Sequence, residues 1–331
     1  MTQQTTDINT TCLVCEGRRA RHTLTLNGHH VYTCRNCGFA FVSPTPTPED
    51  LAHFYDQAYA VPFERYAGNT IRNESRIEEL ERWVSQRGHL LEIGASYGHS
   101  LAVAQKRGWH VSGVELSPTA AQYARDHFGL NVATADLLDA TFSERFDAVI
   151  MWHVLEHTHN PVAQLERIHT LLQPGGVLGL RVPNITSFGA RIAGRAWPWL
   201  CPPAHLWYFS PHTLPRLLAR LGFEVIHVAT LRGDGNNPYQ HLLSATGSRL
   251  NTLRRRVSQR KAQVPGRSNG STSPATTPPP NPAQLQHAWV SLLQRAQPTT
   301  DWMANLTRKP IAALDQAGWG DELLCYAKRA S

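Results

Sequence analysis

The chain has 331 residues, of which 41% are hydrophobic and 17% charged, a globular composition long enough for one large domain with an appendage or for two domains. Its formal net charge of +7 suggests a nucleic-acid or membrane-surface partner. However, residues 247–286 hold seven basic residues and no Asp or Glu, so this stretch carries the whole excess and the rest of the chain is formally neutral.

Two further features bear on location. No apolar run reaches the ~18 residues of a transmembrane helix. The N-terminal segment MTQQTTDINT is polar and lacks the apolar core of a secretory signal. We therefore expect a soluble, cytoplasmic protein.

Four of the six cysteines form two close pairs near the N-terminus, Cys12-x-x-Cys15 and Cys34-x-x-Cys37. Two tight turns that each offer two thiolates supply the tetrahedral geometry that Zn²⁺ prefers. We expect residues 1–43 to form a zinc ribbon whose ion is structural, because four thiolates leave no open coordination position. The alternatives are a ribbon that has lost its metal, or a redox pair.

Residues 44–88 are expected to link this ribbon to the rest of the chain. They begin with alternating prolines, which make a stiff spacer, and Glu49 and Asp50 follow where they can open a helix. Apolar residues at helical spacing predict an amphipathic helix over residues 70–87.

From residue 89 onward, short apolar runs alternate with helical segments, which predicts a parallel sheet covered by helices over residues 89–231. The expected strands are residues 89–95, 110–115, 131–136, 146–152, 176–182 and 223–230. The expected helices are residues 100–107, 118–128, 161–172 and 211–221. Residues 232–320 are expected to be a helical and disordered insertion, and residues 321–331 the final strand of the core.

The segment LLEIGASYG runs from a strand into a glycine-bearing turn and then a helix. Gly94 and Gly98 allow a ligand to approach the backbone closely, and the helix N-terminus offers amide groups. The dinucleotide fingerprint G-x-G-x-x-G is absent, because Ser96 and His99 occupy two of its glycine positions. The loop alone is therefore a weak motif.

Acidic residues at the ends of the next two strands strengthen the prediction that this loop binds a nucleotide-type ligand. Glu115 ends the second strand, where a carboxylate can accept hydrogen bonds from both ribose hydroxyls, and Asp136 ends the third, where it can face an adenine amino group. Taken singly, each acid is equally consistent with a residue that is simply exposed to solvent at the end of a strand. Polar groups at three successive strand ends favour a nucleotide-type ligand.

With these motifs the chain resembles a class I S-adenosylmethionine-dependent methyltransferase of the ubiquinone-type methyltransferase-domain group, in the branch with an N-terminal zinc ribbon. The matching segments are CLVC, CRNCG, LLEIGASYG, VSGVELSP, ATADLLD, FDAVIMWHVLEHTHNP, LLQPGGVLGLRVPN, AHLWYFSPHTL and LGFEV. The resemblance covers about residues 12–231 and 318–328. It implies an α/β, Rossmann-like sheet of seven strands whose last strand is antiparallel.

The resemblance also implies the residues that hold S-adenosyl-L-methionine. They are Glu92, Gly94, Ala95, Ser96, Gly98, Glu115, Leu116, Asp136, Leu137, Trp152 and His153. The chain departs from the family pattern near the fifth strand, where Cys201 and Ala204 replace a common Asp and Arg. This departure puts an anionic-substrate contact there in doubt.

Candidate catalytic residues follow the fourth and fifth strands, where the ligand crevice of an open α/β sheet lies. His205 is the first candidate for a base or for a group that orients the substrate, followed by His157, Glu156 and Tyr208. Glu156 and His157 have an alternative role in bracing the following helix. A metal ion is a further candidate ligand of this segment. Some ubiquinone-type methyltransferases bind a divalent ion with an E-x-x-E-H segment, and this chain has H-x-x-E-H at the same place.

The predicted function is methyl transfer to a small molecule or to a glycan, lipid or natural-product intermediate, on an oxygen, nitrogen or carbon atom. One alternative is C-methylation of a nucleotide-linked sugar. A second is an RNA methyltransferase that uses the basic cluster from Arg249 to Arg267. A third is a non-catalytic interaction module. We expect no nucleic-acid partner, and we assign the basic insertion to docking on an acidic partner or membrane surface.

Overall fold

A computed structural model describes residues 7–47, 70–232 and 318–330. About half of the expected linker and almost all of the expected insertion, including the basic cluster, lie outside these residues. Within the described helices, none is both long and apolar enough to cross a bilayer.

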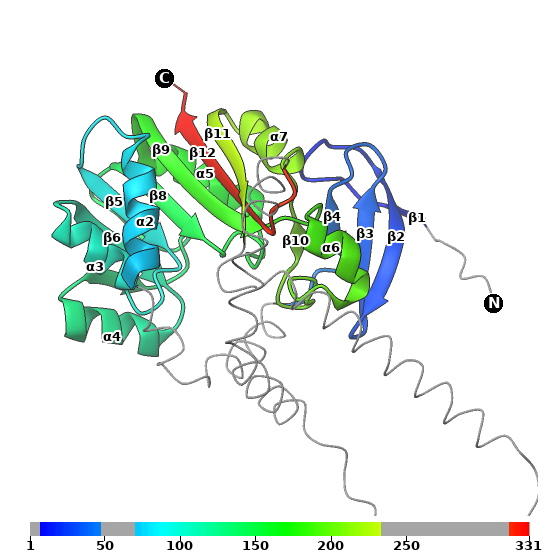
Figure 1. Cartoon of the computed structure of the whole chain (residues 1–331), viewed down its shortest axis with the longest axis horizontal. Helices are drawn as coiled ribbons and strands as arrows, with labels where there is room; N and C mark the ends of the chain where they lie inside the picture. Colours follow the sequence, from blue (N-terminus) through cyan, green and yellow to red (C-terminus); the bar gives the residue numbers. More distant parts are fainter. Residues whose placement is uncertain (1–6, 48–69, 233–317, 331) are drawn as a thin grey trace, which may run out of the picture.

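A seven-stranded sheet forms the larger part of the described chain (Figure 1). Its strands are β5 (His89–Ile93), β6 (His110–Glu115), β7 (Asn131–Thr134), β8 (Phe146–Trp152), β9 (Leu172–Pro183), β11 (Phe223–Leu231) and β12 (Glu322–Arg329). They lie in the order β11-β12-β9-β8-β5-β6-β7. Strand β12 pairs antiparallel with both of its neighbours, β9 and β11, whereas the β8–β5, β5–β6 and β6–β7 pairs are parallel. The expected seven-stranded sheet with an antiparallel last strand is confirmed.

Helix α2 (Thr70–Glu81) precedes the first of these strands. The helices that connect the strands are α3 (His99–Lys106), α4 (Pro118–Phe128), α5 (Pro161–Leu171) and α7 (Thr213–Arg220). Helix α4 starts where Ser117 accepts a hydrogen bond from the Ala120 amide, and it ends at Gly129, whose φ is 64°. Helix α2 is shorter than the expected 70–87. The chain turns after Glu81, and the Trp83 ring then stacks on His227 of β11, with centroids 4.7 Å apart.

Neighbouring residues of each central strand point to opposite faces of the sheet, which gives two cores. Leu91 and Val149 belong to the core on the α5 and α7 side. Leu90 and Ile150 belong to the core on the α2, α3 and α4 side. Because both faces are covered, the strand ends are left as the edges at which a ligand can meet the sheet.

A second sheet carries the cysteine pairs. It is formed by β1 (Asp7–Asn9), β2 (Arg19–Leu26), β3 (His29–Cys34), β4 (Ala40–Val42) and β10 (Trp207–Tyr208), in that order. Strand β10 comes from the segment between β9 and α7, residues 184–209, which we call the lid; the lid also contains α6 (Phe188–Ala193) and the short 3₁₀ helix η2 (Gly194–Ala196). The ribbon of the N-terminal residues is therefore completed by a strand from a distant part of the chain, which lies beside β4 (Figure 1).

Candidate functional site

The loop between β5 and α3 uses backbone conformations that favour glycine. Gly94 has a φ of 69°, and Ser96 has a φ of 49°. The amides of Gly94 and Ala95 both donate to the carbonyl oxygen of Val114, which fixes the loop against β6. A Cβ atom on Gly94 would lie 2.4 Å from Cγ2 of Val154, so the position has no room for a side chain.

Helix α3 begins directly behind this loop. Gly98 is its N-cap residue, with a φ of 80° and no side-chain hydrogen bond. A Cβ atom on Gly98 would lie 2.7 Å from side-chain atoms of both Ala124 and Leu130. The glycine therefore lets the N-terminus of α3, with its free amide groups, pack closely against α4 and Leu130.

Glu115, the last residue of β6, ties this strand to the loop. It is 4% exposed, and its Oε2 and Oε1 accept hydrogen bonds from the amides of Ser96 and Ser117, each at 2.8 Å. Each carboxylate oxygen has a second lone pair and can accept a further hydrogen bond from a ligand hydroxyl. Leu116 beside it is 64% exposed, which places an apolar surface next to the carboxylate.

Asp136 lies beyond β7, because the strand ends at Thr134 and not at Asp136 as expected. The chain turns there, since Oδ1 of Asp136 accepts from the Leu138 amide at 2.8 Å. The same oxygen accepts from Nε2 of Gln164 in α5, also at 2.8 Å. Gln164 is thus a residue of this edge that no sequence pattern marked.

Glu92 is the buried acid of β5. Burial raises the pKa of its carboxyl to about 8, against a hydrogen bond from Ser100 and the charge of Arg76, which both lower it. The carboxyl therefore keeps its proton at neutral pH until a cation approaches it.

A second group of polar side chains lies at the carboxyl end of β8. His153 has a φ of 55°; its Nδ1 lies 3.4 Å from Oε1 of Glu156, and its Nε2 lies 3.4 Å from Oε1 of Glu322. Burial lowers the pKa of His153, but the two carboxylates outweigh burial and raise it to about 9. The ring is therefore an imidazolium at neutral pH, held between two acids.

Further charges extend this group into the sheet. Nη1 of Arg181 in β9 lies 3.6 Å from Oε2 of Glu322, the first residue of β12, and Nη2 lies 2.9 Å from Oε2 of Glu79 in α2. We call Glu79, Glu156, Glu322, His153 and Arg181 the buried charge cluster, in which Glu156, Glu322 and Arg181 are buried and the other two side chains are partly exposed. Three carboxylates against two cations leave it with one excess formal negative charge. A single arginine inside the apolar run of β9 was the signal that sequence reasoning missed.

Glu156 faces two histidine rings from different segments. It is fully buried, and neither of its oxygens has a hydrogen-bond partner among the described residues. Nδ1 of His157 lies 2.8 Å from the carbonyl oxygen of Ala204, and Nδ1 of His205 lies 2.7 Å from that of Trp199. A carbonyl oxygen only accepts, so each Nδ1 carries a proton, and in the neutral ring Nε2 is an acceptor.

This arrangement places three acceptor groups together, which we call the triad. One ligand atom from each of Glu156, His157 and His205 lies within 4.8 Å of the other two. Burial lowers the pKa of His205 to about 3, which keeps its ring neutral. The three groups can therefore receive a proton or hold a cation, and the neutral ring of His205 has no Nε2 proton to give to the acid.

Aromatic rings of the lid cover this triad. Trp199 stacks on His153, with centroids 5.3 Å apart, and on His205, with centroids 5.8 Å apart. The hydroxyl of Tyr208 donates to the carbonyl oxygen of His205 at 3.0 Å, and burial raises the pKa of Tyr208. Tyr208 thus holds the lid backbone at His205.

The four cysteines converge as the spacing predicts. Sγ of Cys12 lies 3.6 Å from Sγ of Cys37, and Sγ of Cys15 lies 3.6 Å from Sγ of Cys34. A tetrahedral Zn²⁺ with Zn–S bonds of ~2.3 Å needs sulfur atoms ~3.8 Å apart, so the four thiols fit this ion. Burial raises the pKa of Cys12 to about 11, whereas hydrogen bonds from the Cys37 and Asn36 backbone outweigh burial and lower that of Cys34.

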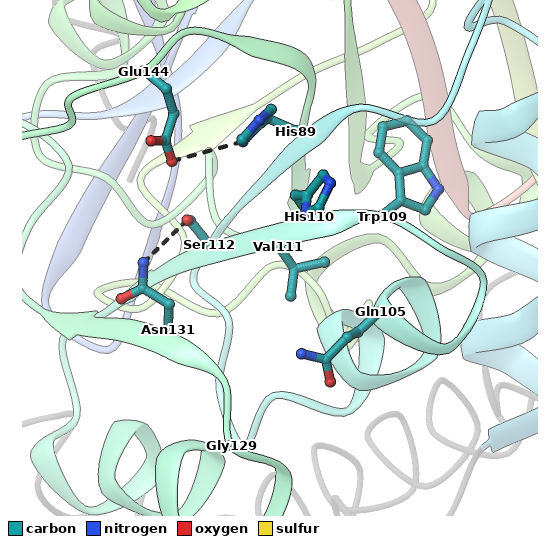
Figure 2. Close-up of a pocket in the computed structure, with 9 residues that line it drawn as sticks. All are labelled: His89, Gln105, Trp109, His110, Val111, Ser112, Gly129, Asn131 and Glu144. Carbon is teal, nitrogen blue, oxygen red and sulfur yellow. Dashed lines mark hydrogen bonds and ion pairs between the residues drawn. The ribbon is translucent and has the colours of Figure 1, made fainter.

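A surface hollow of about 350 Å³ lies elsewhere (Figure 2). Its lining includes the first residues of three parallel strands, His89, His110 and Asn131. Glu144 also lines it, and Oε1 of Glu144 lies 3.8 Å from Nδ1 of His89. These are the amino ends of the strands. The hollow is therefore on the opposite edge of the sheet from Glu115 and the loop.

Comparison with known proteins decides the family. The model of the "methyltransferase domain" family matches residues 63–228, half of the chain. The chain belongs to the methyltransferase domain family.

Relatives within this family match the same part of the chain. An enzyme named ubiquinone biosynthesis O-methyltransferase from Cereibacter sphaeroides is 30% identical over 149 residues, which are 41% of this chain and 60% of that protein. The protein of the same name from Coxiella burnetii is 27% identical over 139 residues, 39% of this chain and 59% of that protein. The matched region thus spans less than two thirds of these relatives.

Among solved structures, a SAM-dependent methyltransferase from Archaeoglobus fulgidus superimposes with a TM-score of 0.47 at 15% identity, over 80% of this chain and 96% of that one. A superposition this loose carries no argument about the site. The methyltransferase-domain sheet is recognised from its own strand order and from the antiparallel β12.

In this methyltransferase-domain protein, the predicted residues fall into two adjoining groups. The first group, on one side of the candidate site, consists of the loop with Glu92, Glu115 and Asp136. Trp152 and His153 adjoin the triad on the other side. Val154 joins the two groups, because its side chain packs against Gly94.

Proposed function

We propose that the chain is an S-adenosylmethionine-dependent methyltransferase that acts on a small molecule. The observation that carries this proposal is the carboxylate of Glu115, which two backbone amides hold beside the loop while its remaining lone pairs can accept from a ligand. Ribose hydroxyls fit these lone pairs, and an adenine ring fits between the exposed Leu116 and the edge formed by Asp136 and Leu137.

The remaining predicted cofactor residues fit the methionine end of the same ligand. Gly94, Ala95, Ser96 and Gly98 form the loop beneath it, Glu92 offers a buried carboxyl to its ammonium group, and Trp152 and His153 lie at the neighbouring strand end. The excess negative charge of the buried charge cluster favours a sulfonium cation over its neutral product. The bound cofactor supplies an activated methyl group, so the chain mainly orients the acceptor and removes its proton.

His205 is the proposed group that orients the acceptor, because burial lowers its pKa to about 3 and makes its ring a weak base. Its Nδ1 is tied to the Trp199 carbonyl, so Nε2 is the atom that accepts a hydrogen bond from an acceptor hydroxyl or amine. Glu156 and His157 lie beside it and are the remaining candidates to receive the proton. Tyr208 acts indirectly, by holding the His205 backbone.

A second role for the triad competes with proton transfer. Three acceptors within 4.8 Å, one of them a buried carboxylate with no hydrogen-bond partner among the described residues, suit a divalent cation that binds the acceptor oxygen. Titration with Mn²⁺, followed by its electron paramagnetic resonance signal, separates the two roles. Tight Mn²⁺ binding that is abolished by Glu156→Gln would support a cation site at the triad. If the protein leaves the concentration of free Mn²⁺ unchanged, the cation-binding role is excluded.

Calorimetry of the full chain with S-adenosylmethionine tests the main proposal. Wild type is expected to bind, and Glu115→Ala is expected to lose the heat of binding because it removes both ribose acceptors. Asp147→Asn is the matched control, since Asp147 accepts a hydrogen bond from the His89 amide at the opposite edge. Absence of binding by wild type at millimolar cofactor would contradict the proposal.

The chemical class of the methyl acceptor is inferred from the family alone. A glycan, lipid or natural-product intermediate and a nucleotide-linked sugar are candidate acceptors, to be separated by transfer of labelled methyl groups to a panel of such compounds. Methylation of RNA with the help of the basic cluster is a competing function, tested by binding of labelled RNA before and after deletion of residues 249–267. A non-catalytic interaction module is a third function, and cofactor binding tests it. Cytoplasmic location, a structural Zn²⁺ at Cys12, Cys15, Cys34 and Cys37, and docking through the insertion belong to the main proposal.

A further inference from the structure

The lid backbone is held between the ribbon and the strand end that carries the triad. Strand β10 pairs with β4, with Trp207 opposite Phe41 and Tyr208 opposite Ala40. The amide of Val42 donates to the Leu206 carbonyl at 2.9 Å, and the amide of Leu206 donates to the Glu156 carbonyl at 2.8 Å. One lid residue, Leu206, therefore connects the ribbon to the segment that bears Glu156.

The ribbon also supplies a third of the buried side chains in the lid's apolar core. A separate cluster of buried side chains joins Val31, Ala40 and Val42 of the ribbon to Ala190, Ala193, Trp197, Leu200, Leu206 and Tyr208 of the lid. Without the ribbon, these lid side chains would expose much of the surface that they now bury. Exposure of apolar surface to water is unfavourable, so the packing of the lid depends on the ribbon.

Phe39 links this contact to the cysteines. Its carbonyl oxygen accepts from the amide of Cys34 at 2.8 Å, so its backbone position depends on the cysteine turn. The side chain is fully buried. Its ring centroid lies 6.3 Å from that of Trp207 and 5.3 Å from that of Phe209, on both sides of Tyr208 along the chain.

Trp207 carries the connection to the segment after β8. Its indole Nε1 donates to the Thr158 carbonyl at 2.7 Å. Together with the bond from Leu206 to Glu156, this fixes both ends of the short segment that contains His157. A shift of the Phe39 ring therefore reaches Glu156 and His157 through two backbone contacts.

We propose that Phe39 is a positioning residue for the acceptor side of the site, through which the cysteine turn holds the lid and the triad in place. This inference rests on the proposed function, because it takes the triad as the acceptor side. It assigns the ribbon a role in the site beyond folding of its own residues. None of these hydrogen bonds and ring contacts involves the loop or Glu115.

Hydrogen exchange of the full chain, followed by mass spectrometry, tests the proposal. We compare zinc-loaded wild type, wild type after chelation, and Phe39→Ala with its zinc content measured. Amides of residues 153–158 and 197–209 are expected to exchange at least about tenfold faster in both altered forms, while those of β5 are unchanged. Phe39→Leu, which keeps a large apolar side chain, is expected to restore most of the protection. Phe142→Ala, which removes a ring that packs on Phe146 at the start of β8, is the matched control and is expected to leave the lid unchanged.

Two results overturn the inference. One is unchanged exchange of residues 197–209 in both altered forms. The other is a loosened lid after chelation but not in zinc-loaded Phe39→Ala, which would show that the connection bypasses Phe39. If Phe39→Ala does not fold, the graded pair Phe39→Leu and Phe39→Val gives the same comparison. Failure of wild type to bind S-adenosylmethionine would overturn the proposed function and leave the exchange result standing, so the two failures are distinguishable.

Discussion

The cofactor side and the acceptor side of the site are built by different means. On the cofactor side, a loop of a few consecutive residues and the next strand end hold each other through backbone amides, and Glu115 is fixed by Ser96 and Ser117. On the acceptor side, Glu156, His205 and Glu322 come from segments far apart in the chain and meet through side chains. A side built from local backbone is rigid on its own, whereas a side built from distant segments depends on what holds each segment.

Gly94→Val should give the largest effect and should act on the cofactor side alone. The new side chain would need the positive φ of Gly94 and would collide with Val154, so we expect the affinity for S-adenosylmethionine to fall by at least about 10³-fold. Calorimetry measures the affinity, and hydrogen exchange of residues 197–209 checks that the lid is intact. Gly129→Ala is the control, because Gly129 has a φ of 64° with nothing within 4 Å of an added Cβ. Normal cofactor binding by Gly94→Val would show that the loop is not the cofactor site.

His205→Ala should act on the acceptor side alone. Loss of the contact that orients the acceptor is expected to lower methyl transfer by about 10²-fold, while cofactor affinity stays within about twofold of wild type. Transfer of labelled methyl to the acceptor panel measures the first quantity, and calorimetry measures the second. His89→Ala, at the opposite edge, serves as control. Wild-type transfer by His205→Ala would remove His205 from the catalytic residues.

Glu92 should give cofactor binding a pH dependence. Burial raises the pKa of Glu92 to about 8, and a bound ammonium lowers it again, so only the ionised carboxyl binds well. Affinity should therefore rise about tenfold from pH 6 to pH 7, where the ligand ammonium is still charged, with uptake of the ligand releasing a proton. Calorimetry in two buffers of different ionisation enthalpy measures both. Glu92→Gln should make the profile flat, and a wild-type profile already flat would exclude this coupling.

Substitution of Glu81 should lower the stability of the fold and leave both the cofactor side and the acceptor side of the site unchanged. Burial alone would raise the pKa of Glu81, but hydrogen bonds from Arg87 and Arg107 outweigh burial and lower it to about 2. A lowered pKa stabilises the fold above the unfolded pKa of about 4.5, and this contribution is lost as the pH falls towards 2. Glu81→Gln should reduce the free energy of unfolding by about 2 kcal/mol at pH 7, measured by urea denaturation.

The difference between wild type and Glu81→Gln should shrink between pH 4.5 and pH 2. Glu78→Gln is the control, because Glu78 is half exposed and its ion pair is with Arg107. An equal loss in both variants would contradict the role of the buried carboxylate.

The sequence predicted those elements whose determinants are local. Strands β6 and β8 and helix α4 begin and end where their apolar runs and the Ser117-Pro118 cap predict. The cysteine spacing likewise predicted a four-thiol cluster. Strand β7 was predicted too long, because the side chain of Asp136 turns the chain by bonding to the Leu138 amide.

The sequence did not predict the groups that depend on contacts between distant segments. Arg181 and Glu322 look like ordinary members of their strands, and only the antiparallel pairing of β12 with β9 brings them together. Strand β10 has two residues and no periodicity of its own, so its addition to the ribbon sheet becomes visible only in the folded chain.

The pairing of β11 with β12 has a consequence for chain length. Leu231 lies opposite Glu322, so the chain leaves the sheet and returns to it at adjacent points. The returning end is fastened separately, since the side-chain amide of Asn184 donates to the Gly320 carbonyl at 2.8 Å. The register of the sheet is therefore independent of how many residues join the two strands. This junction is the natural place to shorten the chain or to graft a foreign domain, provided that Glu322 keeps its place beside His153.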